Sequence, residues 1–319
     1  ISGSAAADAA AVGAILIPAM KQSGYESDFA AAVQAAGGSI GVNIPPSIPM
    51  NIFGFLTGAS IGRLFAAGIL PGILIGLSLI AVATIISRRH GYVATTAFSI
   101  GEVGRTFRRA ILALGAPAII LGGILFGIFT ATESAAVAVV YALAVGLCVY
   151  RQIALGDLPR LFREGAVMSA IVMFIIATAS VFSWIAAIED IPARLAGLLL
   201  SLASDPVYLL LINLILLIAG TFVETTASLI LLVPMITAMQ PALGIDLIQL
   251  GVIVVTNLAI GMLTPPMGIC LIVSSSISGD SLMAISRRIL PFLLILLVDL
   301  LIICFYSPLT MWMANLIAK

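Results

Sequence analysis

The chain has 319 residues, of which 62% are hydrophobic and 9% are charged, and its 14 basic residues balance 14 acidic ones. Soluble domains average about 45–50% apolar and about 25% charged residues, so this composition excludes a soluble globular domain, a disordered chain and a nucleic-acid binder. It predicts an all-α polytopic membrane protein, surrounded by a lipid bilayer and without a nucleic-acid partner.

A helix needs about 20 apolar residues to cross the hydrocarbon core of a bilayer. In chain order, full spans are predicted at residues 28–60, 64–86, 110–128, 134–150, 165–188, 247–278 and 289–317. Three shorter apolar segments, at residues 9–20, 206–220 and 227–239, are typical of re-entrant hairpins, which return to the side from which they entered.

The basic residues give this layout a direction. If each span crosses once, one side receives Lys21, Arg88, Arg89, Arg105, Arg108, Arg109, Arg151, Arg160, Arg163, Arg287 and Arg288. The other side receives Arg63, Arg194 and Lys319. Because Lys and Arg accumulate on the cytoplasmic side of membrane proteins, the larger group marks the inside. Topology, rather than binding of an anion, then accounts for the arginine clusters.

The chain contains an internal repeat of long period. The matching segments are residues 40–46 with 260–266 (I-G-x-x-x-P-P), 16–20 with 232–236, and 3–8 with 220–224. Five predicted crossings separate the two copies, which therefore enter the membrane from opposite sides. Inverted repeats with re-entrant hairpins and proline-broken helices are typical of ion-coupled secondary transporters, and they indicate a site near the membrane midplane.

The two copies differ in what precedes the hairpin tip. The second copy has a half-helix, residues 206–220, before its tip, and the first copy has none before Ile1. The repeat therefore predicts that this sequence is an N-terminally truncated part of a longer subunit.

Each double proline removes two backbone donors and forces the preceding residue out of the helical region. Carbonyl groups one turn upstream lose their helical partners, and hydroxyl groups at the hairpin tips add oxygen atoms that suit Na⁺. Proline and glycine also shape helix packing without binding anything, but duplication of the whole set favours a site. The candidate Na⁺ residues are Ser2, Ser4, Gly41, Asn43, Thr221, Thr225, Thr226, Gly261 and Thr264.

The half-helices also offer a place for a substrate. Free N–H groups at their N-termini suit a carboxylate, and glycine permits close approach of the backbone. The candidate substrate residues are Gly3, Pro45, Pro46, Gly220, Pro265 and Pro266. No organic cofactor and no catalytic residue is expected, because the chain has one histidine, His90, and no H-E-x-x-H pattern.

Four acids interrupt apolar segments. Asp8 and Glu224 lie beside the hairpin tips, and both a capping role and a functional role are open for them. Glu133 follows Thr130 at a spacing that favours a helix N-cap. Asp299 lies in the last span, where pairing with another subunit and extension toward the membrane surface are both open.

Several long motifs point to one family. They are residues 2–8, 16–20, 44–49, 127–133, 220–225 and 257–266. Together they closely resemble the large membrane subunit (DctM type) of tripartite ATP-independent periplasmic (TRAP) transporters, along essentially the whole chain. The resemblance implies an elevator-type ion transporter fold. Its expected parts are a transport domain (residues 1–60 and 206–280), scaffold and connecting helices (61–205) and a C-terminal transmembrane helix (281–319).

The resemblance also implies a function. The chain would be a multi-pass permease of the bacterial cell inner membrane that imports an organic acid, such as a C4-dicarboxylate or sialic acid, with Na⁺. The implied partners are a periplasmic substrate-binding protein and a small four-helix membrane subunit (DctQ type). The alternative is a divalent-anion/Na⁺ symporter that needs no binding protein. An intramembrane enzyme lacks a catalytic set, and a channel is disfavoured because no span carries a polar stripe.

Overall fold

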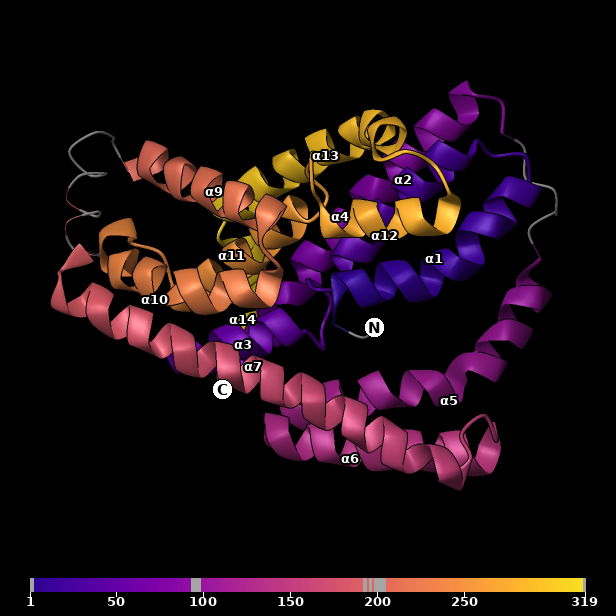
Figure 1. Ribbon diagram of the computed structural model, residues 1–319, viewed down its shortest axis with the longest axis horizontal. Coiled ribbons are helices and arrows are strands. Elements are labelled where there is room, and N and C mark those ends of the chain that lie inside the picture. Colours follow the sequence, from indigo (N-terminus) through magenta and orange to yellow (C-terminus); the bar gives the residue numbers. More distant parts are fainter. Residues whose placement is uncertain (1–2, 93–98, 192–193, 195–196, 198–204, 318–319) are drawn as a thin grey trace. The chain divides into compact units, whose positions relative to one another are not determined.

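A computed structural model describes residues 3–92, 99–191, 194, 197 and 205–317 (Figure 1). Every regular element in these described residues is a helix, which confirms the all-α class. The chain divides into two compact units, Ile1–Ala94 with Ala179–Lys319, and Thr95–Thr178. Ser2, one of the candidate Na⁺ residues, lies outside the described residues.

The first repeat lies in the larger unit. It comprises α1 (Ala5–Gln22), α2 (Ser27–Ile40), α3 (Ile48–Thr57) and α4 (Ile61–Arg89), and α1 packs along α2. Residues 41–47 separate α2 from α3, because Pro45 and Pro46 have no N–H groups to continue the helix. Ser47 then caps α3 by accepting a hydrogen bond from the Met50 N–H at 3.2 Å. The predicted span at residues 28–60 is thus one broken helix.

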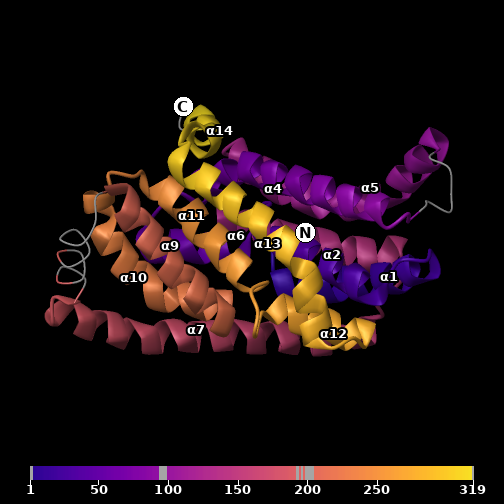
Figure 2. The ribbon, with the colours of Figure 1, turned by 90° about the horizontal axis from the view of Figure 1, so that it is seen from above.

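The second repeat has the same order of elements. A helical hairpin, α9 (Asp205–Phe222) and α10 (Thr225–Leu243), precedes a broken helix, α11 (Leu247–Gly261) and α12 (Ile269–Ser278). The helices α13 (Leu282–Phe305) and α14 (Pro308–Ile317) follow. Figure 2 shows α9, α10 and α11 side by side, and α14 next to α4. The helical hairpin and the second broken helix that the repeat predicts are therefore both present.

The repeat extends further than the sequence motifs indicated. The offset that separates Pro45 from Pro265 also separates Pro71 from Pro291, and each of these prolines lies inside a long helix, α4 or α13, in the motif Ile-Leu-Pro. The prediction of one span at residues 289–317 is wrong, because α13 ends at Phe305 and α14 begins at Pro308. Proline disfavours the helical conformation in the residue before it, which accounts for the break.

The core of the larger unit is built around α11. Every residue of this helix from Ile248 to Gly261 is buried, including the polar residues Gln249, Thr256 and Asn257. The helices α2, α3, α4, α9, α10, α13 and α14 all contact it. A helix that is apolar on all sides belongs in the centre of a membrane protein, where other helices rather than lipid surround it.

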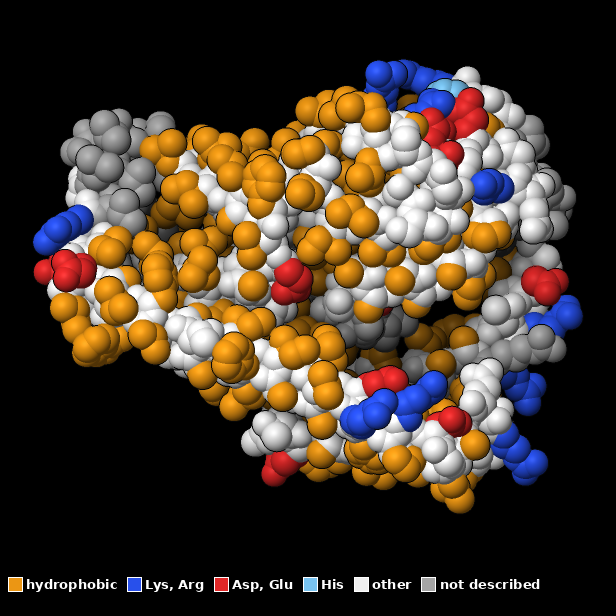
Figure 3. Space-filling model, viewed as in Figure 1, with side chains coloured by type: hydrophobic (Ala, Val, Ile, Leu, Met, Phe, Trp, Pro, Cys, Tyr) orange, Lys and Arg blue, Asp and Glu red, His pale blue; other side chains and the backbone are white. Residues whose placement is uncertain are grey.

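The smaller unit contains α5 (Ile100–Leu125), α6 (Ala131–Ala144), the π-helix η1 (Val145–Val149), the 3₁₀ turn η2 (Leu155–Asp157) and the first part of α7 (Leu158–Ile188). Thr130 and Glu133 form a reciprocal capping box at the start of α6, which confirms the interpretation of Glu133 as a cap. The side chains of this unit are largely exposed, and Figure 3 shows apolar side chains in this part of the molecule together with a group of charged ones.

The membrane spans can be counted by length and composition. In the described residues, four helices are long and apolar enough to cross a bilayer, at Ile61–Arg89, Ala131–Val149, Leu155–Ala186 and Leu282–Phe305. A fifth is possible if α5, which bends by 63°, counts as one span. The two broken helices are not counted among these spans, because each of their halves is too short to cross a bilayer alone. The chain is therefore a polytopic membrane protein.

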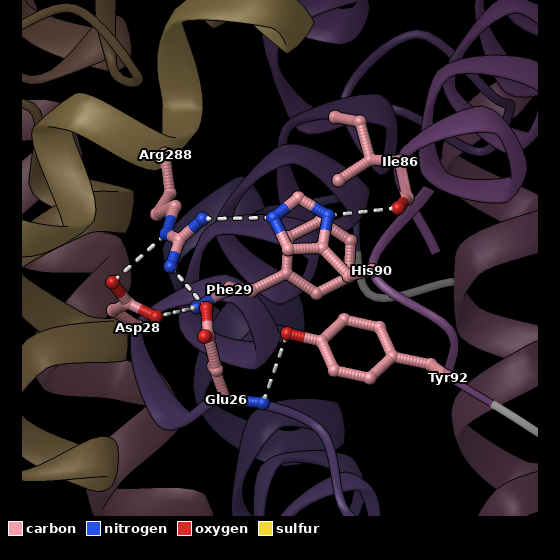
Figure 4. A network of polar contacts seen from close by, with 7 residues as sticks. All are labelled: Glu26, Asp28, Phe29, Ile86, His90, Tyr92 and Arg288. Carbon is pink, nitrogen blue, oxygen red and sulfur yellow. Dashed lines mark hydrogen bonds and ion pairs between the residues drawn. The ribbon is translucent and has the colours of Figure 1, made fainter. Parts of the chain in front are cut away.

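A charged cluster joins three helices at one end of the larger unit (Figure 4). Arg288 of α13 donates from Nε to Asp28 of α2 at 2.9 Å and also binds the Glu26 carboxylate. His90, after α4, lies 3.5 Å from the same guanidinium, and the Tyr92 hydroxyl accepts from the Glu26 N–H. Burial raises the pKa of Tyr92. Arg288 is thus neutralised by two carboxylates of its own chain.

Candidate functional site

The first hairpin tip lies against the break between α2 and α3. Gly3 has φ +73°, and a Cβ atom there would meet the Pro46 oxygen at 2.8 Å and the Ile48 nitrogen at 2.9 Å. The Ile48 N–H donates to the Gly3 oxygen at 3.4 Å. The α1 and α3 helices therefore begin at the same point, where their N-termini place two partial positive charges.

The same break receives the side chain of Asp8. A Cβ atom on Gly41 would lie 2.0 Å from the Asp8 Oδ2 atom, so this carboxylate occupies the space that the absent side chain leaves. The N-cap residue of α1 is Ser4, and Asp8 lies one turn inside the helix. Asp8 therefore contacts the break itself from the first turn of α1.

The second hairpin tip lies against the end of α11. A Cβ atom on Gly261 would meet the Gly220 Cα and carbonyl carbon at 2.6 Å, and the Thr221 nitrogen at 3.0 Å. The Thr225 hydroxyl donates to the Met262 sulfur at 3.2 Å. These contacts bring candidate residues of the hairpin, Gly220, Thr221 and Thr225, to the candidate residue Gly261 and the break that follows it.

A buried bond joins the first break to the second repeat. The Thr256 hydroxyl of α11 donates to Asn43 Oδ1 at 3.0 Å, and both side chains are at most 2% exposed. The neighbouring Asn257 donates from Nδ2 to the Asn213 oxygen and Oδ1 of α9 at 2.9 and 2.7 Å. Thr256 and Asn213 were not among the predicted site residues. Their sequence signal is a polar side chain in the middle of a mostly apolar helix.

The oxygen atoms of the breaks find partners that the sequence did not indicate. The Ser47 hydroxyl donates to the Val42 oxygen at 2.5 Å, the Thr264 N–H to the Gly261 oxygen at 2.9 Å, and the Cys270 N–H to the Met262 oxygen at 3.1 Å. The carbonyls around the double prolines are therefore bonded locally, although each retains a second lone pair that a cation can use.

The threonine hydroxyls behave similarly. Thr221 donates to the Leu217 oxygen at 2.8 Å, Thr264 to the Ile260 oxygen at 3.0 Å, and Thr226 to Glu224 at 3.2 Å. A hydroxyl that donates its proton in this way still presents lone pairs to a cation. Thr226 and Thr264 bond within their own segments, as does Glu224, whose carboxylate accepts from the Thr226 and Ala227 N–H groups. Capping by Glu224 is thus observed.

The remaining candidate residues lie around these contacts. Ser4 is the N-cap residue of α1, and Pro45, Pro46, Pro265 and Pro266 lie in the two breaks. Both Pro–Pro peptide bonds are cis. The arrangement as a whole presents helix N-termini, hydroxyl groups and carbonyl oxygens in two related half-sites, and it contains no cationic side chain among the described residues named as candidates. Such a set suits small ions and polar groups rather than covalent chemistry.

Two hairpin tips, each packed on a proline-broken helix in the same order of elements, define the architecture of a membrane transport protein. The chain belongs to the DctM family, since the model of "Tripartite ATP-independent periplasmic transporter, DctM component" matches residues 1–309. It is a transporter permease of this family rather than an enzyme.

Curated relatives cover almost the whole chain. It is 41% identical to the C4-dicarboxylate TRAP transporter large permease protein DctM of Pseudomonas aeruginosa, over 99% of this chain and 74% of that protein. It is 39% identical to the sialic acid TRAP transporter large permease protein SiaM of Vibrio cholerae, with the same coverage. It is 40% identical to the isethionate TRAP transporter permease protein DctMQ of Oleidesulfovibrio alaskensis, over 99% of this chain and 50% of that protein.

Proposed function

We propose that this chain is the large permease subunit of a sodium-coupled TRAP transporter that imports an organic acid. The observation that carries the proposal is the pairing of each hairpin tip with the break of its own broken helix, Gly3 with residues 46–48 and Gly220 with Gly261. The pairing gathers helix N-termini, which attract a carboxylate, beside hydroxyl and carbonyl oxygens, which attract Na⁺.

The substrate is an organic acid anion selected outside this chain. The relatives are named for C4-dicarboxylate, sialic acid and isethionate, which share an acid group and little else. A permease site made of helix ends and small residues can accept such different molecules. We therefore assign the selection to a periplasmic binding protein, and we expect a small four-helix membrane subunit as second partner in the bacterial inner membrane.

The transport step is an elevator movement. Residues 1–60 and 206–280 are proposed as the moving domain, since α1 and α2 contact α12 and α3 contacts α10 across the two repeats. Residues 61–205 are proposed as scaffold and connecting helices, and within the C-terminal part, residues 281–319, α13 is proposed as the transmembrane helix. The boundary near residue 60 needs its own test, because α4 also contacts α2, α3 and α11.

Liposome uptake tests the coupling and the partners. The full-length permease with its small subunit is reconstituted and given the binding protein loaded with labelled substrate. Uptake that requires both an inward Na⁺ gradient and the binding protein is the expected result. Equal uptake of free substrate without the binding protein would instead establish the alternative, a binding-protein-independent symporter. Equal uptake with K⁺ in place of Na⁺ would refute sodium coupling.

Accessibility from the two sides of the membrane tests the elevator. The three cysteines, Cys148, Cys270 and Cys304, are first replaced. A single Val223→Cys variant at an exposed position of the hairpin tip should then react with an impermeant maleimide from either side, in a ratio that changes with Na⁺. Labelling confined to one side under all conditions would contradict the movement.

A further inference from the structure

Asp299 is a buried acid that the proposed function does not use. It lies on α13 and is 1% exposed, within a stripe of buried residues that is otherwise apolar or a cysteine. The stripe consists of Ile285, Ile289, Phe292, Leu293, Leu296, Leu300, Ile303 and Cys304. The side chain therefore neither extends to the membrane surface nor lies exposed to another subunit.

Among the described residues, the Asp299 carboxyl group has one hydrogen-bond partner. Ser78 Oγ of α4 lies 3.0 Å from Asp299 Oδ1. The other oxygen, Oδ2, is buried and has no hydrogen-bond partner among the described residues. Other acids of the same unit have more polar partners, since Asp28 and Glu26 bind Arg288, and Glu224 accepts hydrogen bonds from two N–H groups.

The depth of Asp299 follows from a second contact between the same two helices. Arg288 of α13 lies beside His90 at the end of α4, 3.5 Å away. Asp299 follows Arg288 by eleven residues, and Ser78 precedes His90 by twelve. At about 1.5 Å per residue, the Asp299–Ser78 pair is about 16–18 Å from the charged cluster. That depth is close to the middle of a hydrocarbon core of about 30 Å.

In the part of the chain that the structure describes, no cationic side chain is placed to neutralise the acid at this depth. The described elements that pack on α13 include α2, α4, α11 and α12, and also α9, whose Asn213 contacts Cys304. Their charged residues are Asp28 on α2, Asp205 on α9, and Arg63, Arg88 and Arg89 on α4, all near helix ends; α11 and α12 have none within their bounds. In the described residues, Asp299 takes part in no ion pair. An ionised carboxylate would thus be buried with one hydrogen bond and no counter-charge, which is strongly unfavourable.

We propose that Asp299 is a proton-binding site at the middle of the membrane, which holds its carboxyl group in the neutral, protonated form. The proton adds to Oδ2, and Oδ1, which is then the carbonyl oxygen, keeps accepting from the Ser78 O–H across the observed 3.0 Å. The Oδ2–H group is then neutral, and a missing partner costs far less for a neutral group than for a charged one. The α4 and α13 helices are joined in this way without a net charge between them.

Infrared spectroscopy of the purified full-length permease at neutral pH detects the proton directly. The wild-type protein should show the C=O stretching band of a protonated carboxyl group, which shifts in D₂O, and Asp299→Asn should lose it. Ser78→Ala should move the band to higher frequency, because the hydrogen bond to the acid is lost. Glu102→Gln, which removes an exposed acid paired with Arg105, should leave the band unchanged.

Two results would overturn the proposal. Absence of a protonated-carboxyl band in the wild-type protein at neutral pH would mean that Asp299 is ionised. A carboxylate band that moves when Na⁺ replaces K⁺ and is lost in Asp299→Asn would mean that the site holds a metal cation. If Asp299→Asn fails to fold, the Ser78→Ala variant provides the test. An unshifted band in Ser78→Ala would mean that the band belongs to another carboxyl group, which would refute the proposal.

Discussion

The two half-sites have the same backbone plan and different side chains. At the first break, side chains fill the space, with Asp8 over Gly41, Ser47 bonded to the Val42 oxygen and Asn43 bonded to Thr256. At the second break, backbone meets backbone, with Gly220 directly against Gly261. The repeat therefore conserves the shape of a broken helix under a hairpin tip, whereas the chemistry that fixes the tip differs. At the two positions that the repeat makes equivalent, Gly41 faces a side chain that can rotate and Gly261 faces backbone.

The largest expected effect comes from alanine at the two glycines that the repeat makes equivalent. In Gly261→Ala the new Cβ meets the Gly220 backbone at 2.6 Å, which cannot move aside, whereas in Gly41→Ala it meets the Asp8 side chain, which can rotate. We expect Gly261→Ala to cost about 1–3 kcal/mol of stability and more than tenfold in uptake. Gly41→Ala should cost about 0.5–1.5 kcal/mol.

Thermal unfolding in detergent and liposome uptake measure both variants. Gly37→Ala is the matched control, because that glycine is exposed in α2 with no atom near its Cβ position. It should be neutral or slightly stabilising. Equal losses in Gly41→Ala and Gly261→Ala would show that the second half-site is no more rigid than the first.

The next effect tests whether the two half-sites are joined. Asn43→Ala and Thr256→Val each leave a buried polar group without its partner, and each should cost about 1–3 kcal/mol. Because the two residues share one bond, the double variant should cost less than the sum of the single ones, by about 0.5–1.5 kcal/mol. Denaturation of the four proteins completes the cycle. Strict additivity would mean that this bond does not couple the first break to α11.

The features predictable from the sequence are those that act locally. Proline and glycine determine where the broken helices and the helical hairpin occur, because each restricts or frees its own backbone conformation. The breaks at residues 41–47 and after Gly261 therefore follow from the positions of these residues in the sequence. Ser307-Pro308 carried the same signal, and the prediction of a continuous last span overlooked it.

The contacts that could not be predicted are those set by tertiary packing. Asn43 meets Thr256 only because α11 runs through the centre of the unit, and Asp8 covers Gly41 only because α1 packs along α2. Local sequence carries no information on either. Likewise, the sequence indicates only that Arg288 lies on the cytoplasmic side of the membrane. Its two carboxylate partners could not be predicted, because they lie far from it along the chain.

A smaller effect concerns the proposed sodium sites, one in each half-site. Ser4→Ala and Thr264→Ala each remove one hydroxyl oxygen, and we expect the Na⁺ concentration for half-maximal uptake to rise about three- to tenfold, equivalent to about 0.7–1.4 kcal/mol. Thr237→Ala is the control, because its hydroxyl makes the same bond to the carbonyl four residues earlier as Thr264 does. It lies far from the tip. Unchanged Na⁺ dependence in both test variants would count against these sites.

The smallest expected effects compare the helix N-caps of the two half-sites, Ser47 and Glu224. Ser47→Ala removes both the N-cap of α3 and the bond to the Val42 oxygen, so it should lower stability by about 1 kcal/mol and disturb the first break. Glu224→Gln keeps an acceptor for the Thr226 and Ala227 N–H groups and removes only a charge at an exposed helix end, which is worth a few tenths of a kcal/mol. Its effect should fade as salt rises, because the charge is open to solvent. Unfolding of both variants at low and high salt checks this, and a salt-independent loss in Glu224→Gln would show that the carboxylate has a role in the second half-site beyond capping.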